Sequence, residues 1–121
     1  MNDYTRNQLR KDIELSYTDK GEIEILISPG YGAGWSTFGW NDDINIALDK
    51  RIIDYYKQNG TKVDKEEVKK FLESIGYEHA YCGGWSQIML DTIPPNCRFR
   101  IDEYDGYETL IECETENWYE L

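Results

Sequence analysis

Residues 99–112 read FRIDEYDGYETLIE, two runs of alternating apolar and polar residues on either side of Asp105-Gly106. Alternation with a period of two around an Asp-Gly pair is typical of a β-hairpin. The segment therefore predicts two antiparallel strands, about 97–102 and 107–113, at the C-terminal end of the chain.

Two registers of this hairpin are compatible with the sequence. A two-residue turn at Asp105-Gly106 pairs Phe99 with Glu112. A three-residue loop at 104–106, with Gly106 at positive φ, pairs Phe99 with Ile111 and Arg98 with Glu112. We expect the three-residue loop, because it aligns apolar residues with each other and opposite charges with each other.

Upstream of this hairpin, the spacing of apolar residues predicts three more strands and two helices. Residues 12–17 and 22–27 alternate around the turn 18–21, which indicates a hairpin with one buried face, and residues 86–93 indicate a further strand. Residues 42–60 have apolar residues at helical spacing, with Asn41 or Asp42 as N-cap and Gly60 as the stop. Residues 64–76 form a second helical pattern, opened by Asp64 and Glu67 as a variant capping box and closed by Gly76.

This order of elements predicts an α+β fold with a mostly antiparallel five-stranded sheet and two helices packed on one face. The chain of 121 residues fits a single domain, 1–121. An aromatic content of 14% is too high for a disordered chain. No apolar run approaches the roughly 20 residues of a membrane span, and the polar N-terminus lacks a signal core, so we expect a cytoplasmic protein.

Charge is distributed unevenly along the chain. The formal net charge is −11, which argues against direct binding of nucleic acid, because phosphate contacts need Lys and Arg. Residues 101–121 contain eight carboxylates and no Lys or Arg, whereas seven of the 13 basic residues lie between 50 and 70. We interpret the basic helices as solvated faces and the C-terminal stretch as an acidic surface that meets a cationic partner.

The sequence offers little support for an enzyme or a cofactor site. Three cysteines, Cys82, Cys97 and Cys113, lack metal or redox spacing and are expected to be buried thiols; the three-residue loop places Cys97 across from Cys113, within reach of an oxidising link. His79 is the single histidine, and nothing near it suggests a nucleophilic pair. A cation site among the hairpin carboxylates is a weaker alternative, since the ligand spacing of an EF-hand is missing. We expect no catalytic residues, no metal and no cofactor.

Two segments rich in glycine and tryptophan, 29–40 and 81–85, are the second unusual feature. A dinucleotide-binding loop at Gly30, Gly32 and Gly34 is disfavoured, because Trp35 stands where that motif needs a further glycine. Either the tryptophans form an aromatic core beneath the loops, or some of them are exposed anchors for a protein partner. The candidate partner-binding residues are therefore Asp102, Glu103, Tyr104, Asp105, Glu108, Glu112, Glu114, Trp35, Trp40 and Trp85.

The motifs GAGWST at 32–37, GGW at 83–85 and FRIDEYDGYE at 99–108 resemble those of a family of small, mostly uncharacterised phage and mobile-element proteins. The resemblance covers about half of the chain, and its specific part is F-R-I-x-E-Y-D-G-x-E. Tyr107 departs from the small residue expected there. The resemblance implies a setting in the bacterial host cell and favours a protein that blocks host defence.

The leading functional hypothesis is a non-catalytic inhibitor of a bacterial defence system, similar to an anti-CRISPR. Its acidic hairpin would occupy the basic nucleic-acid-binding surface of a nuclease or defence effector. One alternative is a sponge for a nucleotide immune signal, held by Arg98 and Arg100 beside Trp85. The other is an accessory phage protein whose charge serves only solubility.

Overall fold

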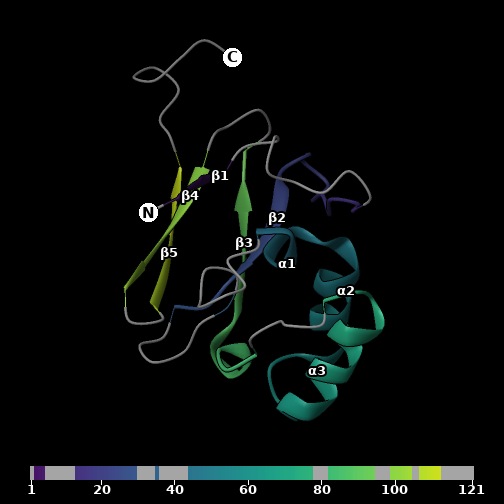
Figure 1. The fold of residues 1–121 in the computed structure, drawn as a ribbon. Helices are drawn as coiled ribbons and strands as arrows, with labels where there is room; N and C mark the ends of the chain where they lie inside the picture. The colour runs from purple at the N-terminus through teal and green to yellow at the C-terminus, as the bar shows by residue number, and fades with distance from the viewer. Residues whose placement is uncertain are drawn as a thin grey trace.

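The computed structural model describes residues 2–4, 13–29, 35, 44–77, 82–94, 99–104 and 107–112, and it has the expected α+β class (Figure 1). Its elements in chain order are β1 (Asn2–Tyr4), β2 (Ile23–Ile27), α1 (Ile44–Leu48), α2 (Lys50–Asn59), α3 (Lys65–Ser74), a 3₁₀ turn (Trp85–Gln87), β3 (Met89–Ile93), β4 (Phe99–Tyr104) and β5 (Tyr107–Glu112). Figure 1 shows β1, β4 and β5 on one side of the molecule and the helices on the other.

The strands of the described residues form two antiparallel sheets, so the prediction of one five-stranded sheet is wrong. One sheet has the order β1-β4-β5, and the other consists of β2 and β3. The N-terminal strand β1, which pairs with β4 through Asn2 to Ile101, was not predicted. The two sheets meet where Ser28, directly after β2, exchanges hydrogen bonds with Glu108 of β5.

The C-terminal hairpin has the register that the sequence analysis rejected. Phe99 pairs with Glu112, and Ile101 with Leu110, which corresponds to a two-residue connection between Tyr104 and Tyr107. The physical reason is the core: Ile101 is 1% exposed, and Leu110 packs against the same core cluster. The three-residue loop would have placed the exposed Thr109 opposite Ile101. Cys97 and Cys113, expected to face each other in that register, lie outside the described residues.

The N-terminal hairpin is formed only in part. Its turn is present, with hydrogen bonds from Gly21 to Thr18 and from Thr18 to Glu22, but Tyr17 makes only an isolated bridge with Ile23. The expectation of one buried face is wrong as well, since Tyr17 is 58% exposed and four of the five β2 residues are buried. Successive residues of a strand point to opposite faces, so burial of Glu24, Ile25, Leu26 and Ile27 in a row means that both faces of β2 are covered.

The predicted helix over 42–60 is broken at Asp49. This residue has extended backbone angles, φ −65° and ψ 121°, and it forms a β-bridge with Leu15. The Lys50 amide then donates to the Glu14 carbonyl at 2.9 Å instead of continuing the α1 ladder. The predicted C-terminal stop is confirmed, because Gly60 ends α2 at a φ of 69° that favours glycine.

The helix predicted over 64–76 is α3, and it follows its sequence signals closely. The Asp64 side chain accepts a hydrogen bond from the Glu66 amide at 3.0 Å, as an N-cap does. Val68 and Leu72 are buried at 0% exposure, and Gly76, at a φ of 102°, follows the helix end. The amphipathic pattern thus fixes which face of α3 packs against the core.

The carboxylate of Asp49 organises the junction of α1, α2 and the chain beyond α3. It accepts from the Arg51 amide at 3.0 Å, from Arg51 Nε at 3.1 Å and from Arg51 Nη2 at 2.7 Å, and from the Tyr77 hydroxyl at 2.8 Å. Burial by itself would raise the pKa of Asp49, but these hydrogen bonds outweigh it and hold the pKa below the ordinary value of 3.8. The ionised form of Asp49 therefore stabilises the fold.

We expect Asp49→Ala to lower the free energy of unfolding by about 2–4 kcal/mol, because the α2 cap is lost and the buried Tyr77 hydroxyl loses an acceptor. Asp49→Asn should cost less, since one oxygen remains. The stability that comes from the ionised carboxylate is present above pH 3.8 and is lost as the pH falls through the lower folded pKa. Urea unfolding between about pH 2 and 7 should therefore show less acid sensitivity for Asp49→Asn than for the wild type. Equal acid sensitivity would contradict this role.

Candidate functional site

The candidate site is the hairpin formed by β4 and β5. In the three-stranded sheet of β1, β4 and β5, β4 is the inner strand. β4 pairs with β5 over six residues and with β1 over three. Asp102 and Glu103 lie on this inner strand, and Glu112 lies at the end of β5. β1 pairs with residues 99–101 of β4, so the acidic residues Asp102 and Glu103 are held in the ladder by their pairing with β5.

Glu108, one of the predicted surface carboxylates, is a buried residue, and its assignment to a partner-binding surface needs correction. Its exposure is 0%, and Oε1 accepts a hydrogen bond from the Ser28 amide at 2.9 Å. Its own amide donates to the Ser28 carbonyl at 2.8 Å. A buried carboxylate requires such donors, so Glu108 fastens the two sheets together and is not available to a partner.

The hairpin register places the remaining acidic residues relative to described neighbours. Asp102 pairs with Thr109, whose side chain is exposed, and Glu103 pairs with the buried Glu108. Tyr104 pairs with Tyr107 at the end of the ladder. Asp105, Glu114 and Trp40, which were also predicted to bind a partner, lie outside the described residues.

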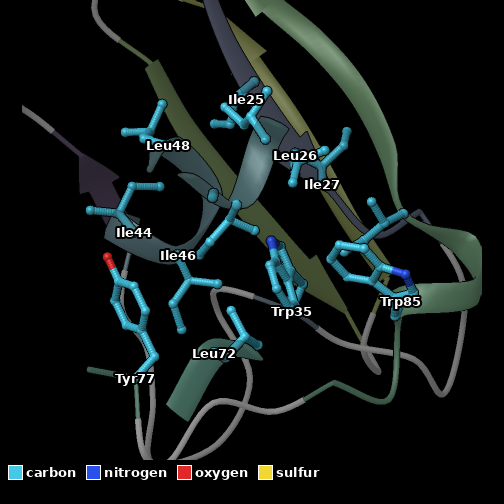
Figure 2. Packing of buried hydrophobic residues seen from close by; sticks show 14 of the residues in the cluster. Ile25, Leu26, Ile27, Trp35, Ile44, Ile46, Leu48, Leu72, Tyr77 and Trp85 are labelled. Atoms are coloured by element: carbon cyan, nitrogen blue, oxygen red, sulfur yellow. The ribbon is translucent and has the colours of Figure 1, made fainter. Parts of the chain in front are cut away.

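Trp35 and Trp85 are core residues, which corresponds to the aromatic-core alternative and not to exposed anchors. Both have 0% exposure, and their rings meet edge to face with centroids 5.7 Å apart. Figure 2 shows Trp35 between Ile46 and Trp85. Trp85 Nε1 donates to the Gly60 carbonyl at 3.0 Å, and the rings of Tyr55 and Tyr56 pack against it edge to face. Offset aromatic pairs of this kind stabilise a core beyond their buried area.

The basic residues of α2 are paired with carboxylates of the fold. Lys57 Nζ lies 2.7 Å from Oε1 of Glu24, a β2 residue whose side chain is 8% exposed and also accepts from the Ser16 hydroxyl. Burial would raise the pKa of Glu24, but hydrogen bonds from Lys57 and Ser16 lower it below the ordinary value. Arg51 pairs with Asp49 in the same manner. The lysines of α3, which are Lys65, Lys69 and Lys70, are exposed.

Metal-ligand groups and Cys82 are the features of the described residues that bear on the cofactor and nucleophile expectations. It contains no group of three or more His, Cys, Asp or Glu that could hold a metal ion. Burial raises the pKa of Cys82 to about 11, so this thiol is protonated at neutral pH and is a poor nucleophile. Its burial agrees with the expectation for the cysteines, while His79 lies outside the described residues. None of the described helices has the length and apolar character needed to cross a membrane.

Comparison of the chain with protein-family models, with curated proteins and with solved structures finds no match.

Two residues have structural roles that differ from their sequence-based interpretation. Asp49 falls inside the helix predicted over 42–60, and Glu108 was predicted to lie on the partner-binding surface. For Asp49 a signal exists, since Asp is a preferred N-cap and is followed by the good helix formers Lys50 and Arg51. The burial of Glu108 depends on Ser28, 80 residues away, and has no local signal.

We expect Glu108→Ala to lower the free energy of unfolding by about 1–3 kcal/mol, because the buried Ser28 amide loses its acceptor. Glu108→Gln keeps an amide oxygen at that place and should cost about 1 kcal/mol or less. Urea unfolding at pH 7 measures both. A Gln variant as unstable as the Ala variant would show that the hydrogen bond to Ser28 is not what makes Glu108 important.

Proposed function

We propose that this protein is a non-catalytic binding protein that presents the acidic β4–β5 hairpin to the basic, nucleic-acid-binding surface of a bacterial defence nuclease or effector. The observation that carries the proposal is the combination of eight carboxylates and no Lys or Arg in residues 101–121 with an ordered antiparallel ladder across 99–112. The proposed setting is the cytoplasm of the bacterial host.

The ladder supports this function because it spaces charge regularly. Residues of an antiparallel strand rise about 3.4 Å each, so the acidic residues of β4 and β5 stand at separations that a strand fixes. Asp102 and Glu103 lie on the inner strand, where they pair with Thr109 and Glu108 of β5. A partner therefore meets the charges without first ordering the segment that carries them, which lowers the entropic cost of binding.

The distribution of positive charge also supports this choice of surface. Arg51 and Lys57 pair with the buried carboxylates of Asp49 and Glu24, and Lys50 pairs with Asp54 at 2.8 Å. These contacts place cations of α2 beside acidic residues outside the hairpin. Negative charge on the hairpin would then steer the protein toward a cationic groove, with an association rate that falls as salt rises.

The structure gives the nucleotide-sponge alternative no specific support. That alternative requires the Trp85 ring to stack on a ligand, but the ring has 0% exposure and is packed among aromatic residues. Arg98 lies outside the described residues. The alternative in which the charge serves only solubility is separated from our proposal by the following experiment.

The experiment compares two variants with the same change in net charge. Asp102→Asn neutralises the hairpin carboxylate that pairs with the exposed Thr109, and the control Glu66→Gln neutralises an exposed carboxylate on α3. Each protein competes with a fluorescent target DNA for purified RNA-guided nuclease complexes, and phage plating is counted on bacteria that express the same complexes. Glu108 is left unchanged because its replacement disturbs the sheet junction.

We expect the wild type and the α3 control to displace DNA and restore plating, with weaker displacement at higher salt. The hairpin variant should bind roughly threefold more weakly, as expected for the loss of one charged contact of about 0.7 kcal/mol. If both variants compete with DNA more weakly than the wild type, and by the same factor, only the total charge of the protein matters. Failure of the wild type to displace DNA or restore plating with any complex tested would overturn the proposed function.

A further inference from the structure

Strand β3 has an outer edge to which no other strand is paired among the described residues. β3 pairs with β2 alone, from Met89 opposite Ile27 to Ile93 opposite Ile23. The Glu24 amide donates to the Ser16 carbonyl at 2.9 Å, on the side of β2 away from β3. In an antiparallel ladder, the residue opposite such a position directs its own amide and carbonyl away as well. Thr92, the partner of Glu24, therefore directs these groups toward the outer edge.

The amide and carbonyl of Leu90, two residues before Thr92, also point toward the outer edge, because the direction of these groups repeats every second residue of a strand. Leu90 and Thr92 thus present an alternating set of donors and acceptors, the arrangement to which an added strand binds. Met89, at the start of the strand, is 44% exposed and would provide an apolar contact.

Asp91 controls what can pair with this edge. Its Oδ1 accepts the hydrogen bond of the Thr92 amide at 2.8 Å, so a side chain covers one outward donor. Asp91 stands opposite the fully buried Ile25, and a charged residue at such an edge position is a known defence against unwanted strand pairing. If β3 of a second copy paired antiparallel with this edge and Asp91 were at the centre, the two Asp91 carboxylates would lie opposite each other. Like charges directly opposite each other destabilise strand pairing.

We propose that the outer edge of β3 is a docking site for an extended, cationic segment of a partner protein. The segment would add a strand through the backbone of Leu90 and Thr92 and would place a lysine or arginine beside Asp91. The charge that repels a second copy, each with a net charge of −11, attracts this partner. The inference goes beyond the proposed function, because it uses β3 and not the hairpin.

Docking exchanges the hydrogen bonds at the edge without leaving a donor unpaired. The Asp91 carboxylate leaves the Thr92 amide and accepts from the cationic side chain. A carbonyl of the added strand then accepts from the Thr92 amide. Charge-assisted hydrogen bonds are stronger than neutral ones, so the exchange favours a cationic strand over a neutral one.

The test uses a blocked peptide of alternating threonine and lysine, long enough to pair with all five residues of β3, titrated into the ¹⁵N-labelled full-length protein. The amide signals of Leu90 and Thr92 should shift and become protected from hydrogen exchange. Asp91→Asn keeps an oxygen that can cap the Thr92 amide, and it should bind this peptide roughly fivefold more weakly. Asp91→Lys should prefer a matched peptide of alternating threonine and glutamate.

Three controls decide whether the edge itself is the site. A peptide N-methylated at every residue lacks the backbone donors for a ladder on both of its edges and should not bind; equal binding would overturn the proposal. Glu73→Gln on α3 and Asp102→Asn on the hairpin change the net charge by one, as Asp91→Asn does, and should bind the peptide like the wild type. Weakening by either that equals the weakening by Asp91→Asn would show attraction to total charge. Concentration-dependent dimerisation of the wild type that protects the Thr92 amide would assign the edge to a second copy and contradict the inference.

Discussion

The pair of hydrogen bonds between Glu108 and Ser28 is the contact on which the arrangement of the two sheets depends. It joins β5, near the C-terminal end of the chain, to the residue that follows β2, and both residues have 0% exposure. Burial of a carboxylate costs free energy unless the carboxylate is hydrogen-bonded. The hydrogen bond to the Ser28 amide therefore specifies the position of β5 beside Ser28. The β1-β4-β5 sheet thereby lies with Ile101 in the common core.

The helical side is specified in a similar way by two other carboxylates. Asp49 ends α1, caps α2 and receives the Tyr77 hydroxyl from beyond α3, while Glu24 ties β2 to Lys57 of α2. Removal of one partner from a buried polar network costs more than the network contributes in net stability, so such networks select one arrangement of elements. Three acidic residues of this very acidic chain thus serve its architecture.

The parts of this fold that could be predicted from sequence are those with a local cause. The boundaries of α3 follow from the Asp64 cap, the stripe of Val68 and Leu72, and Gly76, all within one short segment. The C-terminal hairpin was located correctly, but its register depends on which residues reach the core. Cross-strand pairing favoured Phe99 with Ile111, whereas burial of Ile101 beside Leu110 decided the outcome.

The candidate site was harder to predict, because composition does not distinguish a surface carboxylate from a buried one. Glu108 and Asp102 both lie in alternating strand patterns, and their roles are separated by the hairpin register, which pairs Asp102 with the exposed Thr109, and by the contact of Glu108 with Ser28. The tryptophan segments were ambiguous for a related reason, since Trp serves cores and interfaces alike. Trp35 and Trp85 belong to the core because Tyr55, Tyr56 and the Gly60 carbonyl surround Trp85.

Charge and architecture together limit how this protein can meet a partner. The cations of α2 lie against Asp49, Glu24 and Asp54, so they offset acidity within the helical side of the fold. The stretch 101–121 contains eight carboxylates and no cation of its own, so no such compensation is available within this segment. A body with a net charge of −11 repels its own copies and anionic polymers, so the two proposed surfaces, the hairpin and the β3 edge, require the same class of ligand, a cationic protein surface.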